Sequence, residues 1–252
     1  MIAVALVFYQ PNFKSLYGQY FPSATPLPTS TKVPTPTPNW TATQKVIETT
    51  ATAHAIQSTI ADASNNWNAL LSEPFNNNDN NWETELSESE WNEIYRKIDN
   101  GKYTWDATAK KGFISWIDAN TISTTDFYLT VEAKQLDGTT SSDYGLIFRQ
   151  DIGSNFYYFG IGDDSFFVGL SYNNEWLNII DWTTSNAISP NGSNRLTVIA
   201  SGSHFIFLIN DQFAGEAIDN HIPKGTVGLA VVIHTANQQA NFEFDNFELR
   251  VP

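Results

Sequence analysis

Short apolar and aromatic runs separated by turn residues dominate the chain from residue 91 onward. The turn signals between them include Asn100-Gly101, Asn173-Asn174 and Asn210-Asp211, which favour tight hairpins. The runs predict strands at 94–98, 102–105, 113–117, 127–134, 143–150, 155–162, 165–172, 176–181, 194–200, 204–209, 212–218, 226–233 and 240–250. Many short strands with no helical period after residue 72 indicate an antiparallel sandwich.

Two of these runs, 144–149 and 156–161, are apolar at both odd and even positions. Alternate residues of a strand point to opposite faces, so both faces of these strands are expected to be sheltered from water. We therefore predict an all-β fold of two packed antiparallel sheets, in which one sheet also has a partly sheltered outer face.

The segment 41–71 has a different pattern, because it contains neither proline nor glycine and has a helical period. Apolar or small residues recur every seven positions, in two sets offset by three: Val46, Ala53, Ile60, Trp67, Thr49, Ile56, Ala63 and Leu70. This pattern predicts one Ala/Thr-rich helix that ends before Pro74. It fits either a coiled-coil neck, through which the protein associates with itself, or a single helix that serves as a spacer.

The N-terminal region predicts a surface-displayed protein. Residues 22–38 hold six of the eleven prolines, and proline keeps a chain extended, so this segment is interpreted as a stiff stalk. The apolar run 1–9 is shorter than the roughly 20 residues of a membrane-spanning helix. We interpret it as the outer end of an N-terminal transmembrane anchor that is incomplete in this chain; the alternative is the apolar start of an irregular segment.

These patterns divide the chain into four parts: an apolar anchor remnant at 1–21, a Pro/Thr-rich stalk at 22–40, a helical linker at 41–72 and a β-sandwich at 73–252. The expected location is extracellular, at the cell surface.

Composition narrows the possible partners. The formal net charge is −14 and the isoelectric point is about 4.5, which argues against binding to nucleic acid or to anionic membrane surfaces. Membrane contact is therefore expected only through the N-terminal anchor. The chain has no cysteine, so disulfides, thiolate catalysis and Cys-ligated zinc are excluded.

Several segments together resemble one superfamily. They are Tyr144–Arg149, Asn155–Phe159, Asn194–Val198, Asn210–Phe213, Gly225–Leu229 and Phe244–Leu249. From Glu73 onward the chain is similar to the concanavalin A-like lectin/glucanase superfamily, and within it to laminin G-like and 3-keto-disaccharide hydrolase-type jelly-roll domains of stalked bacterial surface proteins. The resemblance implies a jelly roll and an extracytoplasmic location. It does not imply an activity, because the superfamily contains lectins, hydrolases and structural modules.

One carboxylate motif suggests hydrolysis. Glu243, Asp245 and Glu248 have the spacing of the catalytic motif in laminarinase-type glucanases, where paired carboxyls act as nucleophile and acid. On a strand, Glu248 joins the face of the other two only if a bulge intervenes. The motif lies near the C-terminus, where non-catalytic relatives have their closing strand, so no catalytic residue is assigned and glycoside hydrolysis is kept as an alternative.

The same resemblance implies a structural calcium ion. In related jelly rolls such an ion joins the acidic N-terminal segment to the last strand, which carries over to Glu73, Asn77 and Asp245. Asn77 replaces the usual aspartate and lowers the charge of this site. The alternative is that Asp245 accepts hydrogen bonds from backbone donors.

Aromatic and polar residues suggest a carbohydrate site, because sugars stack their C–H faces on aromatic rings and bond their hydroxyls to polar groups. The candidates are Trp116, Arg149, Tyr157, Trp176, Asp181 and Trp182. Arg149 is expected to project from the concave sheet, and Tyr157 is expected to lie on the neighbouring strand. The alternative for each aromatic residue is a place in the core or in strand pairing. The four histidines have no metal-ligand spacing and suggest no catalytic triad.

The sequence thus supports three hypotheses. The first is a non-catalytic, surface-displayed module that recognises a polysaccharide or other glycan. The second is a structural or protein-binding sandwich that assembles oligomers with the help of 41–71. The third is a glycoside hydrolase.

Overall fold

The computed structural model describes residues 40–119 and 123–252. The predicted anchor remnant and all of the predicted stalk except its last residue, Trp40, lie outside these residues. The chain divides into two units, a helical one up to Thr59 and a sandwich from Ile60 to Pro252, and we describe each by itself. Among the described helices none is long and apolar enough to cross a membrane.

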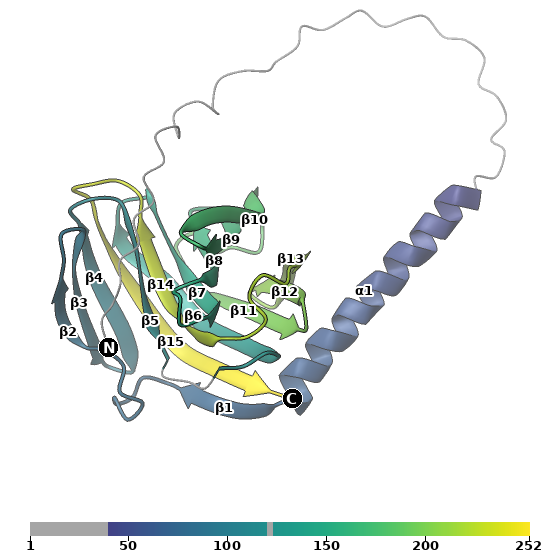
Figure 1. Ribbon diagram of the computed structural model, residues 1–252, viewed down its shortest axis with the longest axis horizontal. Helices are drawn as coiled ribbons and strands as arrows, with labels where there is room; N and C mark the ends of the chain where they lie inside the picture. The colour runs from purple at the N-terminus through teal and green to yellow at the C-terminus, as the bar shows by residue number, and fades with distance from the viewer. Residues whose placement is uncertain (1–39, 120–122) are drawn as a thin grey trace, which may run out of the picture. The chain divides into compact units, whose positions relative to one another are not determined.

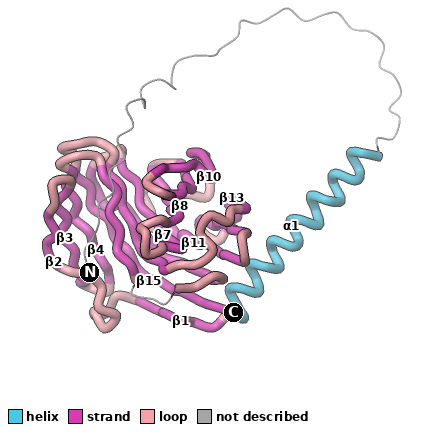
Figure 2. The backbone as a smooth tube through the Cα atoms, in the orientation of Figure 1, coloured by secondary structure: helices cyan, strands magenta, loops and turns pink. Residues whose placement is uncertain are grey.

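The sandwich consists of two antiparallel sheets (Figures 1 and 2). One sheet has nine strands, ordered β13-β12-β11-β6-β15-β4-β3-β2, with β1 also paired to β15. The other has six strands, ordered β10-β9-β8-β7-β14-β5. The larger sheet is built from β1 (Asn68–Glu73), β2 (Glu85–Glu88), β3 (Asn92–Asp99), β4 (Lys102–Ala109), β6 (Phe127–Gly138), β11 (Asn194–Ser201), β12 (His204–Ile209), β13 (Gln212–Ile218) and β15 (Gln239–Val251). The smaller is built from β5 (Phe113–Asp118), β7 (Ser142–Gln150), β8 (Phe156–Gly162), β9 (Ser165–Tyr172), β10 (Glu175–Thr184) and β14 (Thr226–Ile233). The predicted two-sheet fold is confirmed.

The turn residues explain how successive strands pair. At the hairpins Asn100-Gly101, Asn173-Asn174 and Asn210-Asp211, both central residues have positive φ, between 51° and 71°. Asparagine, aspartate and glycine adopt this left-handed conformation at low cost, and it matches the twist of two-residue hairpins. The three hairpins predicted from these residues are therefore confirmed.

The core lies between the sheets and follows the alternation along each strand. In β6, for example, Phe127, Leu129 and Val131 are fully buried in the core. Burial of each such side chain contributes roughly 1.5–3 kcal/mol to folding. Several other buried residues of the six-stranded sheet lie outside this core cluster, among them Trp116, Phe156 and Phe167. They face the opposite side of that sheet, as the apolar pattern at both parities predicted.

The end of the helix differs from the prediction. Helix α1 (Trp40–Asn66) ends at Asn66, and after Trp67 the six residues of strand β1 pair with β15. The sandwich therefore begins at Asn68 instead of residue 73, and the apolar positions Trp67 and Leu70 are not helical. Polar contacts hold this junction: the Asp62 carboxylate accepts hydrogen bonds from the side chains of Asn66 and Trp67. Self-association through 41–71 stays a prediction.

Candidate functional site

An aromatic row crosses the outer face of the six-stranded sheet. It is formed by Trp116 on β5, Phe156 on β8, Trp176 and Trp182 on β10 and Phe167 on β9. Successive ring centroids are 4.8 Å apart for Trp116–Phe156, 6.4 Å for Phe156–Trp176, 5.7 Å for Trp176–Phe167 and 5.3 Å for Phe167–Trp182. The last two pairs are close to parallel, with interplanar angles of 24° and 23°. Ring pairs in this range attract one another beyond the effect of area burial.

Glycines on the same face let these rings lie against the sheet. A Cβ atom at Gly169 would be 2.2 Å from Trp176 Cζ2 and 2.6 Å from Phe167 Cζ. At Gly160 it would be 2.4 Å from the hydroxyl of Tyr158. These distances are too short for a carbon atom, so the missing side chains make the space that the rings occupy. The glycines of β8 and β9 are therefore as necessary for the aromatic row as the aromatic residues themselves.

The row becomes accessible at β10. Trp116 and Phe167 are each 7% exposed, and Trp176 is half-buried. Trp182 is 47% exposed. An indole that is held by stacking on one side and open to solvent on the other can accept the apolar face of a ligand. Trp182 is thus the part of the row that a ligand can contact directly.

A polar cluster lies beside Trp182. The Asp143 carboxylate, on β7, is 1% exposed and accepts hydrogen bonds from Tyr158 Oη at 2.5 Å and His234 Nε2 at 2.6 Å. A Cβ atom at Gly162 would lie 3.2 Å from Asp143 Cβ and 3.6 Å from Trp182 Cη2, so both side chains border Gly162. The His234 side chain is 50% exposed. A buried carboxylate, a half-exposed imidazole and an exposed indole therefore meet at one end of this sheet.

Electrostatic effects are strong in this cluster. Burial, together with the adjacent charge of Asp143, raises the pKa of Tyr158 well above its ordinary value, so Tyr158 stays protonated and donates to Asp143. Partial burial alone would lower the pKa of His234, but the charge and hydrogen bond of Asp143 outweigh it and raise the pKa above 6.5. Perturbed groups of this kind occur preferentially at functional sites.

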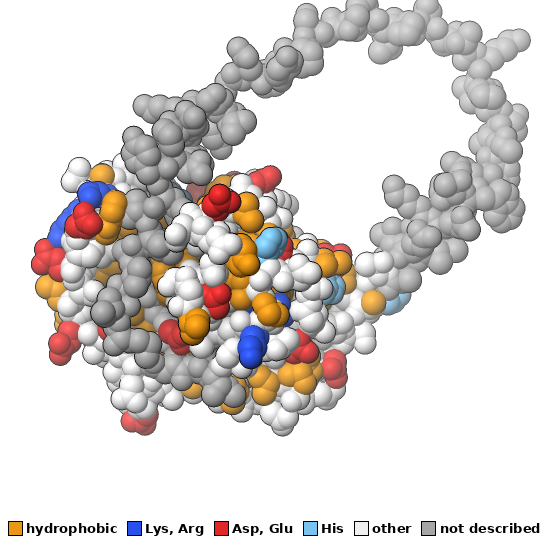
Figure 3. Space-filling model, viewed as in Figure 1, with side chains coloured by type: hydrophobic (Ala, Val, Ile, Leu, Met, Phe, Trp, Pro, Cys, Tyr) orange, Lys and Arg blue, Asp and Glu red, His pale blue; other side chains and the backbone are white. Residues whose placement is uncertain are grey.

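The surroundings of the aromatic row carry little positive charge. The six strands of its sheet contain a single Lys or Arg, Arg149, against the acidic residues Asp118, Asp143, Glu175 and Asp181. On the side of the molecule in Figure 3, acidic side chains are scattered over the sandwich and Lys and Arg occupy only a few places. This distribution agrees with the net charge of −14.

Arg149 has a different orientation from the predicted one. Its backbone has φ 51°, and its guanidinium turns away from the outer face and stacks 4.7 Å from the ring centre of Phe205, in the opposite sheet. It donates hydrogen bonds to the carbonyls of Ile222 at 3.1 Å, Thr125 at 2.8 Å and Gly202. The prediction that Arg149 projects from the concave face is wrong, because the left-handed backbone reverses the alternation of β7 at this residue.

Tyr157 also turns away from the outer face. It is fully buried in the core and stacks on Phe148, with ring centroids 5.2 Å apart. Its hydroxyl donates to Asp219 and accepts the backbone N–H of Ile222. Tyr157 lies on β8, the strand beside that of Arg149, but its ring belongs to the core, which was the alternative for each aromatic candidate. On β8 the outward residues are its neighbours, Phe156 and Tyr158.

Of the remaining predicted sugar contacts, the three tryptophans lie in the aromatic row and Asp181 does not. Trp116, Trp176 and Trp182 all belong to the aromatic row, although only Trp182 is widely exposed. Asp181 is exposed and accepts a hydrogen bond from Asn178 Nδ2 at 2.7 Å, and it lies outside the Asp143 cluster. The structure therefore brings the three tryptophans into one row and leaves Asp181 outside the polar cluster beside it.

The predicted calcium ligands are not brought together. Glu73 points into the sandwich and accepts hydrogen bonds from Phe75 N, Asn80 Nδ2 and Trp82 Nε1. Asp245 is on the outer face of the same sheet, 2.5 Å from Lys102 Nζ. Asn77 accepts the backbone N–H of Asp79. Within 40–119 and 123–252, no group of three His, Asp or Glu side chains is arranged to hold a metal ion. The residues present do not fit a calcium site, because their oxygens already have donors.

The carboxylate motif contains the bulge that Glu248 needs to share a face with Glu243 and Asp245. The pairing of β15 with β6 shifts between Asp245 and Glu248, and Asn246 has φ 49°. This bulge places Glu243, Asp245 and Glu248 on the outer face of the nine-stranded sheet, the side opposite to the aromatic row. Lys102 lies 3.8 Å from Glu243, and Arg250 lies 2.9 Å from Glu248.

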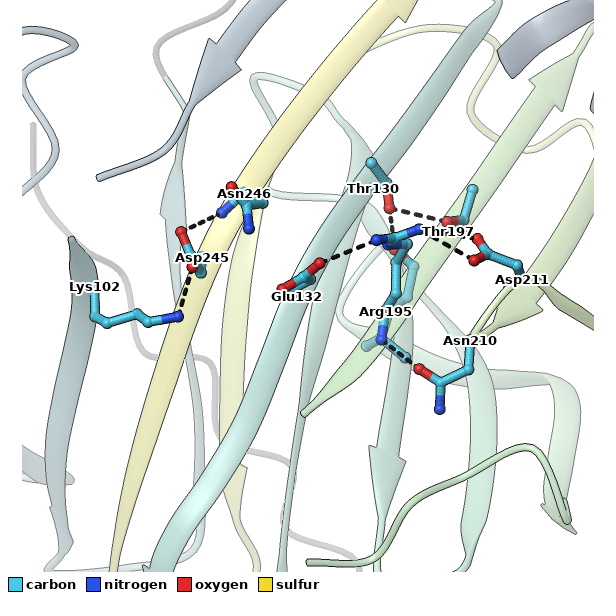
Figure 4. A network of polar contacts seen from close by, with 10 residues as sticks. Lys102, Thr130, Glu132, Arg195, Thr197, Asn210, Asp211, Asp245 and Asn246 are labelled. Atoms are coloured by element: carbon cyan, nitrogen blue, oxygen red, sulfur yellow. Dashed lines mark hydrogen bonds and ion pairs between the residues drawn. The ribbon is translucent and has the colours of Figure 1, made fainter. Parts of the chain in front are cut away.

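Figure 4 shows two of these residues, Lys102 and Asp245, in a wider row of charged side chains that also contains Glu132 and Arg195. Asp245 and Glu132 are cross-strand partners on β15 and β6, and each is paired with a cation on its other side, Lys102 at 2.5 Å and Arg195 at 3.1 Å. The hydrogen bond with Asp245 is the main cause that raises the pKa of Lys102. Paired cations stabilise ionised carboxylates, whereas a glycosidase acid has to hold its proton. The motif therefore resembles a solvated, charge-paired sheet face.

Two residues of this polar cluster, Asp143 and His234, were not predicted from the sequence. They are 91 positions apart. The only available signal was a single carboxylate within the apolar run 143–148, since a buried charge requires a partner.

Comparisons with known proteins give the fold. No known protein family and no curated protein matches the sequence. The carbohydrate-binding module CBM66 from Bacillus subtilis is 18% identical over 73% of this chain and 95% of its own, with a TM-score of 0.50. A Bacillus subtilis protein of unknown function with a galectin-like fold is 13% identical over 72% of this chain and 95% of its own, with a TM-score of 0.53. The laminarinase catalytic domain from Thermotoga maritima is 8% identical over 74% of this chain and 98% of its own, with a TM-score of 0.55. The sandwich therefore has the jelly-roll fold of galectin-like and laminarinase-type domains, as the resemblance implied.

Proposed function

We propose that this protein is a non-catalytic carbohydrate-recognition module, and that it binds glycans at the Trp182 end of the outer face of the six-stranded sheet. One observation carries the proposal: an exposed indole, held by a row of stacked rings, lies beside a buried carboxylate and a half-exposed imidazole. Sugar rings require this combination, an apolar surface for their C–H faces and directional polar groups for their hydroxyls.

Proteins of the same fold support the proposal. A carbohydrate-binding module and laminarinase domains are among the structures similar to this chain, and their names refer to carbohydrate binding or cleavage. The further proposal of display at a cell surface rests on the Pro/Thr-rich composition of 22–38 and on the apolar start of the chain.

Replacement of Trp182 tests the site. The full chain and W182A are titrated with a panel of polysaccharides, and reducing-sugar release is read in the same wells. We expect at least one polysaccharide to bind without release, and W182A to raise its Kd about tenfold, which corresponds to about 1.4 kcal/mol. The matched control is F213A, since Phe213 is 46% exposed and lies on the other sheet; its Kd is expected to stay within twofold of the unmodified chain.

Two results would contradict the proposal. If no polysaccharide binds, the structural or protein-binding alternative is favoured. If W182A and F213A bind equally well, the glycan contacts another surface.

Glycoside hydrolysis is the second candidate, and a specific observation favours it. The bulge in β15 places Glu243, Asp245 and Glu248 on one face, as the laminarinase-type motif requires. The ion pairs that these carboxylates make argue against it. Release of reducing sugar by the full chain would establish this second function.

A further inference from the structure

We propose that His234 is the hydroxyl-binding residue of this glycan site, that Asp143 positions it, and that the ligand is an uncharged saccharide. This inference rests on the proposed function. It adds a specific polar contact and a ligand class, and both can fail while glycan binding itself is confirmed.

The geometry places the polar residues next to the stacking residue. Trp182 and Asp143 both border Gly162, with Cη2 and Cβ at 3.6 and 3.2 Å from the position of a Cβ atom at this glycine. His234 directly follows β14, the neighbour of β7, and bonds Asp143 from that side. Trp182, Asp143 and His234 thus come from β10, β7 and the residue after β14, and they lie near the same end of this sheet.

The buried carboxylate decides which ring nitrogen of His234 is available. An ionised aspartate only accepts hydrogen bonds, so the Nε2 atom of His234 carries the hydrogen at 2.6 Å from Asp143. In the neutral imidazole, Nδ1 is then an acceptor. Among the described residues no hydrogen bond to His234 Nδ1 is found, and half of the side chain is exposed. Nδ1 can therefore accept a hydrogen bond from a ligand hydroxyl.

The charge around this site selects an uncharged ligand. The outer face of the six strands presents no Lys or Arg side chain, since Arg149, the single basic residue in them, is turned inward. Asp143 is buried beneath the site, and Asp118 lies on the same face at β5. Uronate or sulfate groups would approach these carboxylates, and the six strands present no Lys or Arg side chain to receive them. A neutral glycan has no such cost.

Protonation of His234 is expected to oppose binding. The charged group that acts on His234 is Asp143 on β7, which also accepts a hydrogen bond from Tyr158 on β8. Next to Asp143, β14 and β5 present the uncharged Val232 and Ile114. Protonation turns Nδ1 from an acceptor into a donor, and a bound sugar would remove water from the imidazolium. The ligand therefore lowers the pKa of His234, and by linkage affinity falls as pH decreases through that pKa.

The test uses the full chain and the uncharged polysaccharide that binds it most tightly in the panel. Kd is measured from pH 8 to pH 5.5 for the unmodified chain, H234A, H234Q and H204A. His204 is the matched control, because it is 37% exposed and pairs with Glu216 at 2.7 Å on the other sheet. The unmodified chain and H204A are expected to lose about tenfold in affinity toward pH 5.5. H234A is expected to bind about tenfold more weakly at pH 8, and H234Q, which keeps an amide donor and an acceptor, to bind well with no pH step.

The His234 imidazole signals in NMR titrations give a second readout. Its pKa should fall when the polysaccharide is added and should be lower in D143N, and thermal melts of each variant confirm that it is folded. Binding that is sensitive to W182A but unchanged in H234A overturns this inference alone, as does tighter binding of a uronate-containing glycan. Absence of all glycan binding overturns the proposed function together with it.

Discussion

At the residue scale, buried arginine side chains hold this sandwich together from inside. Arg149 is 1% exposed and donates to three backbone carbonyls from three different segments of the chain. Its guanidinium geometry allows this, since lysine has a single ammonium group and cannot reach three acceptors arranged as a fork. Arg149 is therefore a structural clamp between loops.

Replacement of Arg149 should affect stability and leave the glycan site intact. R149M removes the donors of three carbonyls, and we expect a loss of about 3 kcal/mol in the free energy of unfolding, since an unsatisfied buried acceptor costs roughly 1–3 kcal/mol. The matched control is R195M, because the Arg195 side chain is 44% exposed and its ion pairs lie on the surface. Chemical denaturation measures both. A loss below 1 kcal/mol in R149M would contradict the clamp.

The faces on which the Arg149 and Tyr157 side chains lie could not be derived from the sequence, for two different reasons. Which face a strand residue occupies follows from alternation, and alternation fails where the backbone leaves the β region. Arg149 has φ 51° although arginine has no preference for this conformation, so nothing in the sequence marks the reversal. Tyr157 could not be assigned because both parities of its strand are apolar. The pairing of Asp143 with His234 depends on strand order, which a single sequence does not contain.

At the element scale, segment 67–73 illustrates competition between two local patterns. Trp67 and Leu70 continue the helical period of the sequence. The residues from Asn68 onward nevertheless form β1, which pairs with the C-terminal part of β15. Pairing of β1 with β15 forms backbone hydrogen bonds along an edge of the last strand that would otherwise be open. This stabilises the strand conformation of the segment more than local helix propensity stabilises a helix. The predictions succeeded where turn residues fix the chain locally, as at Asn210-Asp211, and failed where a distant strand decides.

Truncation tests whether segment 67–73 is a part of the sandwich, as strand β1, or only a continuation of the helical linker. A chain that begins at Ile60 keeps β1, whereas one that begins at Pro74 loses it together with Glu73, whose carboxylate bonds Phe75 N and Trp82 Nε1. We expect the shorter chain to be less stable by about 3 kcal/mol or more, because two buried donors lose their acceptor and β15 gains an open side. Thermal melts of both chains measure this. Equal melting temperatures would mean that β1 is dispensable.

At the scale of the whole molecule, the two sheets expose faces of opposite character. On the outer face of the six-stranded sheet, aromatic rings lie against glycine residues. On the outer face of the nine-stranded sheet, acidic and basic side chains form ion pairs (Figure 4). Composition indicated both an aromatic-rich and an acidic protein, but only the fold separates these properties onto opposite sides. The site proposed for glycans and the motif suggested for hydrolysis are therefore kept apart by the thickness of the sandwich.

Because the two candidate sites lie on opposite faces, substitutions at one site are expected not to affect the other. The packed sheets lie about 10 Å apart, so side chains on their outer faces are too distant to interact directly. We expect the double variant E243Q/E248Q to bind glycan with the Kd of the unmodified chain, and W182A to weaken binding equally in both backgrounds. If glycan release is detected and disappears in E243Q/E248Q, the nine-stranded sheet is catalytic. If the double variant instead loses binding, the glycan contacts the charged face, and the aromatic row has to be explained by packing alone.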